Sequence, residues 1–367
     1  MFILRKVVLA LVIVSLFTAC NSSSSDDGPT ENKDSYERGA LLVNLADNFI
    51  IPAFQDLNAN LINLKAAKEA FIKSPDQVHL DALRASWLAS YKVWQSVEMF
   101  NIGKAEALLY GLQMNVYPTS VQEVKANILS GNYDLSHPNN IDAVGFPALD
   151  YMLYGVAAND AAIINVYSDA QYTKYLSDVI NQMQALTETV LNDWTSSYRD
   201  VFVSETGNTA TSALNKLTND YVFYFEKGLR ANKFGIPAGN FSSTPLPETV
   251  EGRYSGIYSK DLALESLSAA LHVFNGKSYA SNATGESFKT YLEYLDRDDL
   301  VNTIITKFGD AQLKLNALDV NFYNQINTDN TKMLQAYDAL QLIVVSLKVD
   351  MLQAFNINVD YVDADGD

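Results

Sequence analysis

Cysteine, histidine and basic residues are all scarce in this sequence. Cys20 is its single cysteine, so the chain cannot form an internal disulfide, and zinc or redox sites built from several cysteines are excluded. The three histidines, His79, His137 and His272, stand far apart without partners at ligand spacing, so we expect no hydrolytic zinc site made from them. The net charge of −17, without a basic stripe, argues against nucleic acid as a partner.

The sequence also lacks the sustained alternation of apolar and polar residues that marks a half-buried β-strand, so a sheet of any size is not expected. Apolar residues instead recur at spacings of three and four, which is typical of amphipathic helices. Each half of the chain provides about four such segments, enough for a helical bundle. We therefore predict an all-α fold of two similar up-and-down helical bundles, at 35–200 and 210–367, related by duplication.

The N-terminal segment has the pattern of a lipoprotein signal peptide. Two basic residues precede an apolar run at 7–17, which is too short to span a bilayer. We predict a signal peptide at 1–19, acylation of Cys20 as the anchor to the lipid membrane, and a polar tether at 20–34. This predicts an outer membrane lipoprotein, periplasmic or surface-exposed. The alternative is an ordinary secretory signal with a chance cysteine.

Two irregular segments occur in the second half of the sequence. The segment 233–259 is rich in glycine and proline, and a loop of this length in a helical domain is uncommon unless it is functional or disordered. We expect it to form a wall or lid. At the end of the chain Asp363, Asp365 and Asp367 imitate the opening of a calcium-binding loop, but the closing glutamate is absent, which favours a solvated acidic tail.

The stretch from Gly145 to Gly155 reads as a short helix that begins at Pro147, because proline suits the first helical position. Phe146 and other apolar residues follow the spacing of one buried face. Asp150 stands one residue off this stripe. It is either a functional carboxylate or a first-turn acid that answers the helix dipole.

A second candidate acid is Glu98. An apolar stripe at helical spacing carries Trp87 and Trp94, which we interpret as core residues, and Glu98 occupies the last position of that stripe. An acid at such a position is either buried with a partner or exposed at the mouth of a cleft. Both interpretations stay open.

These features together resemble the imelysin family, also called imelysin-like peptidases. The resemblance rests on residues 87–103, on the Gly145–Gly155 stretch, on Lys233-Phe-Gly-Ile-Pro, and on the terminal Asp-Ala-Asp-Gly-Asp. It implies two similar helical bundles with a cleft between them, a place in the bacterial envelope and an association with iron acquisition. It also implies a Gly-x-His-x-x-Glu motif that faces the cleft.

The chain departs from this motif at two of its three positions. Gly145 matches the glycine, but Pro147 replaces the histidine and Asp150 replaces the glutamate. A proline can neither bind a metal nor activate water. With Glu98, which matches a glutamate of the family, these residues are the candidate binding positions, and no catalytic residue is assigned.

The resulting hypothesis is a non-catalytic binding or accessory protein of iron uptake that uses the cleft. Iron, another divalent or trivalent cation, or haem would be its ligand, and an envelope uptake protein would be its partner. The alternatives are an envelope metallopeptidase, as the family label suggests, and a surface module that binds another envelope protein.

Overall fold

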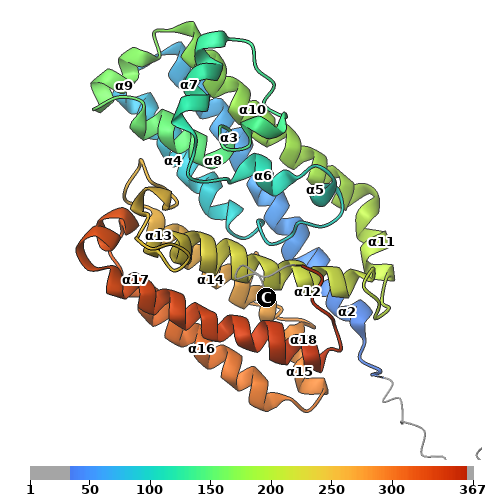
Figure 1. Ribbon diagram of the computed structural model, residues 1–367. Coiled ribbons are helices and arrows are strands. Elements are labelled where there is room, and N and C mark those ends of the chain that lie inside the picture. Colours follow the sequence, from blue (N-terminus) through green and yellow to red (C-terminus); the bar gives the residue numbers. More distant parts are fainter. Residues whose placement is uncertain (1–33, 362–367) are drawn as a thin grey trace, which may run out of the picture. The chain divides into compact units, whose positions relative to one another are not determined.

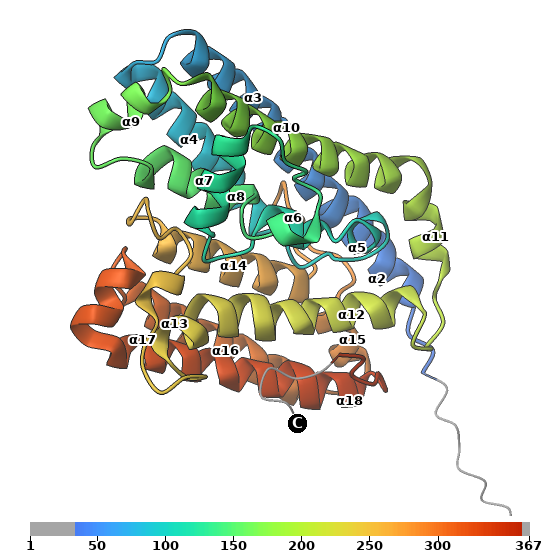
Figure 2. The same ribbon diagram turned by 45° about the horizontal axis from the view of Figure 1, so that its top comes forward.

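The computed structural model describes residues 34–361, and the account below concerns the compact unit that begins at Glu37. The all-α prediction is confirmed (Figures 1 and 2). Between residues 34 and 361 the β pairing is confined to one isolated antiparallel bridge, from Lys277 to Thr284. The predicted signal peptide, Cys20, nearly all of the tether and the acidic tail from Asp363 lie outside the described residues.

The first half of this unit is built around four helices, three of which are long. They are α2 (Arg38–Leu45), α3 (Ile51–Lys73), α4 (Gln77–Trp94) and α10 (Ala170–Asp193). Helix α3 packs along both α4 and α10. The shorter helices of this half are α5 (Lys104–Ala107), α6 (Tyr110–Met114), α7 (Val121–Ser130), α8 (Gly145–Asp150), α9 (Asp160–Val166) and α11 (Arg199–Ser204).

The second half contains a further group of packed helices, in which α16 lies along α17 and α14 contacts α16. Its helices are α12 (Ala213–Phe223), α13 (Ile236–Ala238), α14 (Ser259–Phe274), α15 (Phe288–Tyr294), α16 (Asp298–Asn316), α17 (Phe322–Val345) and α18 (Leu352–Ala354). The two halves are in direct contact, through α4 with α14 and α2 with α12. Their origin by duplication stays a prediction.

Several helices contain π-helical turns, which are rare and concentrate at functional sites. These turns are η1 (Ala46–Ile50), η3 (Tyr151–Gly155), η4 (Trp194–Tyr198), η5 (Tyr224–Gly235) and η7 (Ser346–Met351). The longest, η5, carries three charged side chains that are at most 2% exposed: Glu226, Arg230 and Lys233. Two short 3₁₀ turns, η2 (Pro138–Asn140) and η6 (Pro247–Thr249), complete the elements.

The core matches the apolar stripe of the sequence. Trp87 and Trp94 are 0% and 1% exposed, so their interpretation as core residues is confirmed. The prediction for the end of that stripe was wrong, because α4 stops at Trp94 and Glu98 lies in the turn that follows. None of the helices between residues 34 and 361 is long and apolar enough to cross a membrane.

Candidate functional site

Gly145 occupies a backbone position that only glycine fits. Its φ of +73° lies in the left-handed region, which L side chains rarely adopt. A Cβ at this position would stand 2.1 Å from the carbonyl oxygen of Met114, at the end of α6. Gly145 therefore lets the start of α8 approach the segment after α6 closely. Its role is to allow a close backbone contact.

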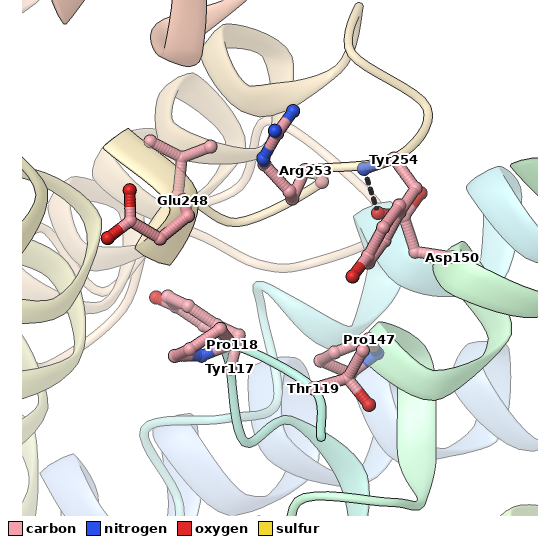
Figure 3. Close-up of a pocket in the computed structure, with 10 residues that line it drawn as sticks. Tyr117, Pro118, Thr119, Pro147, Asp150, Glu248, Arg253 and Tyr254 are labelled. Carbon is pink, nitrogen blue, oxygen red and sulfur yellow. Dashed lines mark hydrogen bonds between the residues drawn. The ribbon is translucent and has the colours of Figure 1, made fainter. Parts of the chain in front are cut away.

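Pro147 is the third residue of α8, which begins at Gly145, so the prediction that the helix starts at this proline was wrong by two positions. Its side chain is buried and lines a small pocket of about 20 Å³. Figure 3 shows this pocket with Tyr117 and Pro118 beside Pro147, and Arg253 on the opposite wall. The position where the family motif has histidine thus presents only a pyrrolidine ring.

Asp150 is 2% exposed and holds the turn that follows η6. Its Oδ2 accepts a hydrogen bond from the backbone N–H of Tyr254 at 2.7 Å, and its Oδ1 accepts one from the N–H of Ser255 at 2.9 Å (Figure 3 draws the first). Burial raises the pKa of Asp150 to about 6, against the opposing effect of these two backbone hydrogen bonds. Because Asp150 is the last residue of α8, the interpretation as a first-turn acid was wrong.

The residues at the motif do not fit a metal ion. A metal site here would need an imidazole and a carboxylate with free lone pairs. Pro147 offers no donor atom, so the Asp150 carboxylate, which already accepts two backbone hydrogen bonds, has no second ligand from the motif beside it. Within residues 34–361, no group of three or more His, Cys, Asp or Glu side chains stands close enough to hold a metal ion.

Glu98 lines a second, much larger cavity of about 610 Å³. Its Oε1 accepts a hydrogen bond from Asn115 Nδ2 at 3.1 Å, whereas its Oε2 is buried without a hydrogen-bond partner among the described residues. The indole N–H of Trp94 is near enough to lower the pKa of Glu98 slightly, but it makes no well-formed hydrogen bond. Burial is the dominant influence and raises the pKa of Glu98 to about 7.

A buried polar network adjoins Glu98. Lys233 Nζ pairs with Glu251 and donates a hydrogen bond to Gln95 Oε1 at 2.8 Å. Asn115 Nδ2 donates both to Glu251 Oε1, at 3.0 Å, and to Glu98. Ser266 Oγ donates to Gln95 Oε1 at 2.7 Å. The network thus joins residues from both halves of the sequence, and it satisfies a lysine and a glutamate that are 1% and 2% exposed.

Glu98 and Asp150 do not line the same cavity. Each faces its own pocket, and the two pockets share the residues Tyr117 and Pro118 as a common wall. The segment 233–259 contributes to both, with Thr249 in the larger cavity and Arg253 in the smaller one.

Sequence patterns missed most of this arrangement. Gln95, Asn115, Glu251 and Ser266 carry no motif, and only their contacts reveal them. Asp220, on α12, also lines the larger cavity, and burial together with the nearby Glu106 raises its pKa to about 8. The three histidines have other partners: His79 hydrogen-bonds with Asp76, His137 accepts from the N–H of Asn139, and His272 contacts Lys277.

The comparison with protein families decides the assignment. The model of the family described as Imelysin matches residues 50–347, which is most of the chain. The chain belongs to the imelysin family. This confirms the resemblance found in the sequence.

Individual imelysin-related proteins resemble the chain more distantly. Iron-regulated protein A of Synechococcus elongatus is 24% identical over 180 residues, which are 47% of this chain and 44% of that protein. The match therefore spans less than half the length of this curated relative.

Solved structures share the fold. An imelysin-like protein from Psychrobacter arcticum 273-4 superposes with a TM-score of 0.71 at 18% identity, over 89% of this chain and 97% of that one. A protein from Parabacteroides distasonis ATCC 8503, assigned as an iron-regulated protein A precursor, gives a TM-score of 0.73 at 18% identity over 90% and 97% of the two chains.

Proposed function

We propose that this imelysin-family protein is a non-catalytic binding protein of the bacterial envelope, anchored by acylated Cys20, that serves iron acquisition. In this proposal the ligand occupies the 610 Å³ cavity that Glu98 lines, and the Gly145–Gly155 motif has a structural role. The observation that carries the proposal is the altered motif, in which Pro147 offers no ligand atom and the Asp150 carboxylate binds the backbone N–H groups of Tyr254 and Ser255.

The cavity has the properties of a small-molecule site. Such sites are concave, mostly apolar and supplied with a few polar groups that orient the ligand. Here apolar side chains such as Met99 and Ile236 make most of the wall, and Glu98 supplies a buried carboxylate. The association with iron is supported by the names of the relatives from Synechococcus and Parabacteroides.

Two glycines allow a matched test of the cavity. Gly111 lines the cavity, and a Cβ added there meets no atom within 4 Å; the same is true of Gly309 on the exposed side of α16. We therefore expect Gly111→Trp to fill the cavity and Gly309→Trp to leave it open. Both helices lose a flexible residue, so the pair differs mainly in the space that the indole occupies.

The experiment is growth under iron limitation of a strain that lacks the gene, complemented with each variant. We expect Gly309→Trp to restore growth as the wild type does and Gly111→Trp to fail, although both proteins melt at similar temperatures. Restored growth with a folded Gly111→Trp protein would reject the cavity as the functional site. Titration of the purified protein with ferric, ferrous, zinc and calcium ions and with haem tests the ligands hypothesised from the sequence.

The rival functions give different results. If the protein digests a peptide library, and if both a chelator and Asp150→Ala abolish this digestion, the protein is a metallopeptidase and the proposal is overturned. If the protein is instead a protein-interaction module, the wild type and Gly111→Trp should capture a partner from native membranes equally well. The anchor has its own test, since Cys20→Ser should release the protein from the membrane fraction.

A further inference from the structure

The rim of the 610 Å³ cavity exposes large apolar side chains. Leu109, Leu112 and Phe223 line the cavity and are 58%, 43% and 43% exposed. Exposed apolar side chains that gather at one concave place mark a binding surface more often than scattered ones do. One part of the ligand should therefore be apolar.

Leu109 adds a second indication. Its φ and ψ of 51° and 42° are left-handed, a conformation that costs a leucine free energy and that clusters at binding sites. This conformation lies at the junction of α5 and α6, and it places an exposed leucine side chain at the cavity. The chain thus keeps a strained backbone and an exposed apolar side chain at the same point.

The charged residues of the cavity are mainly acidic. Glu98 and Asp220 line it together with Lys227, which has an interaction of its own within the chain. The other buried cation nearby, Lys233, is already paired with Glu251. The carboxylate of Glu98 accepts one hydrogen bond, from Asn115, and its buried Oε2 makes none among the described residues, so a cation in the cavity that Glu98 lines would stabilise its ionised form.

We infer that the cavity binds a small organic cation, an amine whose ammonium group pairs with Glu98 and whose apolar body lies against Leu109 and Phe223. This inference rests on the proposed function, because it names the ligand class of the same cavity. An anion would be repelled by an ionised Glu98, although Asp220, with a pKa raised to about 8 by burial, is mostly protonated at pH 7. A bare metal ion is disfavoured, because no group of three or more His, Cys, Asp or Glu side chains in residues 34–361 could hold one.

The test uses three probes that share a phenylbutyl body. They are 4-phenylbutylamine, which is cationic, 4-phenylbutanol, which is neutral, and 5-phenylpentanoate, which is anionic. Each is titrated calorimetrically at pH 7 into the purified full chain in a non-ionic detergent. We expect the amine to bind at least about tenfold more tightly than the alcohol, because only the amine offers a charged donor to Glu98.

Glu98→Gln is the decisive variant, and Asp310→Asn is its control. Both substitutions replace a carboxyl group by an amide, but Asp310 lies on the exposed side of α16, a helix that contributes no residue to the lining of the cavity. We expect Glu98→Gln to weaken amine binding about tenfold or more and Asp310→Asn to leave it unchanged. Binding of the amine to the wild type should also release a proton from Glu98. This release appears as a binding heat that varies with the ionisation enthalpy of the buffer, and Glu98→Gln should reduce it.

The outcomes separate this inference from the proposed function. If the alcohol or the carboxylate binds as tightly as the amine, or if Glu98→Gln leaves amine binding intact, the cationic ligand class is wrong. If none of the probes binds, the inference also fails. The proposed function is judged separately, by the growth of the Gly111→Trp strain under iron limitation.

Discussion

Lys233 Nζ donates a hydrogen bond to Glu251 Oε2, and both side chains are almost completely buried. The pair joins the π-helical η5 to the turn after η6. Asn115 connects Glu251 to Glu98, so the ion pair supports the carboxylate that faces the large cavity. After burial, Lys233 and Glu251 have the next largest effects on the pKa of Glu98, and these two effects are opposite in sign.

The buried ion pair predicts a large effect of removing one partner. Lys233→Met should lower the free energy of unfolding by about 3–5 kcal/mol, because it leaves the Glu251 carboxylate buried without its cation. Urea denaturation measures this. Asp299→Asn breaks the exposed Arg297–Asp299 pair and should change the same free energy by less than about 1 kcal/mol. A Lys233→Met protein as stable as the Asp299 variant would contradict the role given to the pair.

Replacing the Asp150 carboxylate by an amide should change the free energy of unfolding by an amount that depends on pH. Asp150→Asn turns an amino group toward one of the two backbone N–H donors, so it should cost about 1–3 kcal/mol at pH 8. Because burial raises the pKa of Asp150 to about 6, the wild type is more stable at pH 5, where its carboxyl is mostly protonated, than at pH 8. Asparagine does not titrate, so the difference should be larger at pH 5, by about 1 kcal/mol. Urea denaturation at both pH values checks this. An equal loss at pH 5 and pH 8 would show that the charge of Asp150 is unimportant.

Glu98 predicts how stability changes with pH. Its pKa is raised from 4.5 to about 7 in the folded protein, so the folded state binds more protons than the unfolded state between these values. The free energy of unfolding should therefore fall as the pH rises from about 5 to about 8, and Glu98 should contribute up to about 3 kcal/mol of this fall. Asp220, with a pKa raised to about 8, acts in the same direction.

Comparison of Glu98→Gln with the wild type isolates this contribution. The variant should match the wild type near pH 5 and be more stable at pH 8, since glutamine carries no buried charge. If the two unfolding curves stay parallel from pH 5 to pH 8, Glu98 titrates normally in the folded protein. A variant that gains stability but loses amine binding would show that the carboxylate is kept for function.

Gly145 predicts a steric cost that is independent of pH. Gly145→Ala should lower the free energy of unfolding by at least about 2 kcal/mol, since its Cβ would meet the Met114 carbonyl oxygen and its φ is positive. Gly309→Ala, in the open and helical α16, should instead stabilise the protein by up to about 1 kcal/mol. Thermal melting of the two variants should show shifts of opposite sign.

Pro147 predicts that restoring the family's histidine alone does not restore a metal site. In Pro147→His an imidazole would stand near Asp150, whose oxygens are held by the N–H groups of Tyr254 and Ser255. We expect zinc to bind this variant no more tightly than the wild type in a calorimetric titration. Tight binding of one zinc ion per chain would show that the Asp150 carboxylate can leave these amides.

Local patterns predicted the fold class and part of the site. The stripe that includes Trp87 and Trp94 identified a buried helical face, because the three-four spacing reports directly which side chains share a face. The same spacing misplaced Glu98, since periodicity does not show where a helix ends, and α4 ends at Trp94. The motif positions were recognised by resemblance, but their contacts were not.

The sequence by itself determined the helical architecture, the membership in the imelysin family and the loss of the motif histidine at Pro147, because each depends on residue type and short-range spacing. Only the tertiary structure decided what the acids do. It brings the amides of Tyr254 and Ser255 to Asp150, and it leaves one buried oxygen of Glu98 without a hydrogen-bond partner among the described residues. The pKa and availability of a carboxylate depend on burial and on partners that are distant in the sequence, which no local pattern encodes.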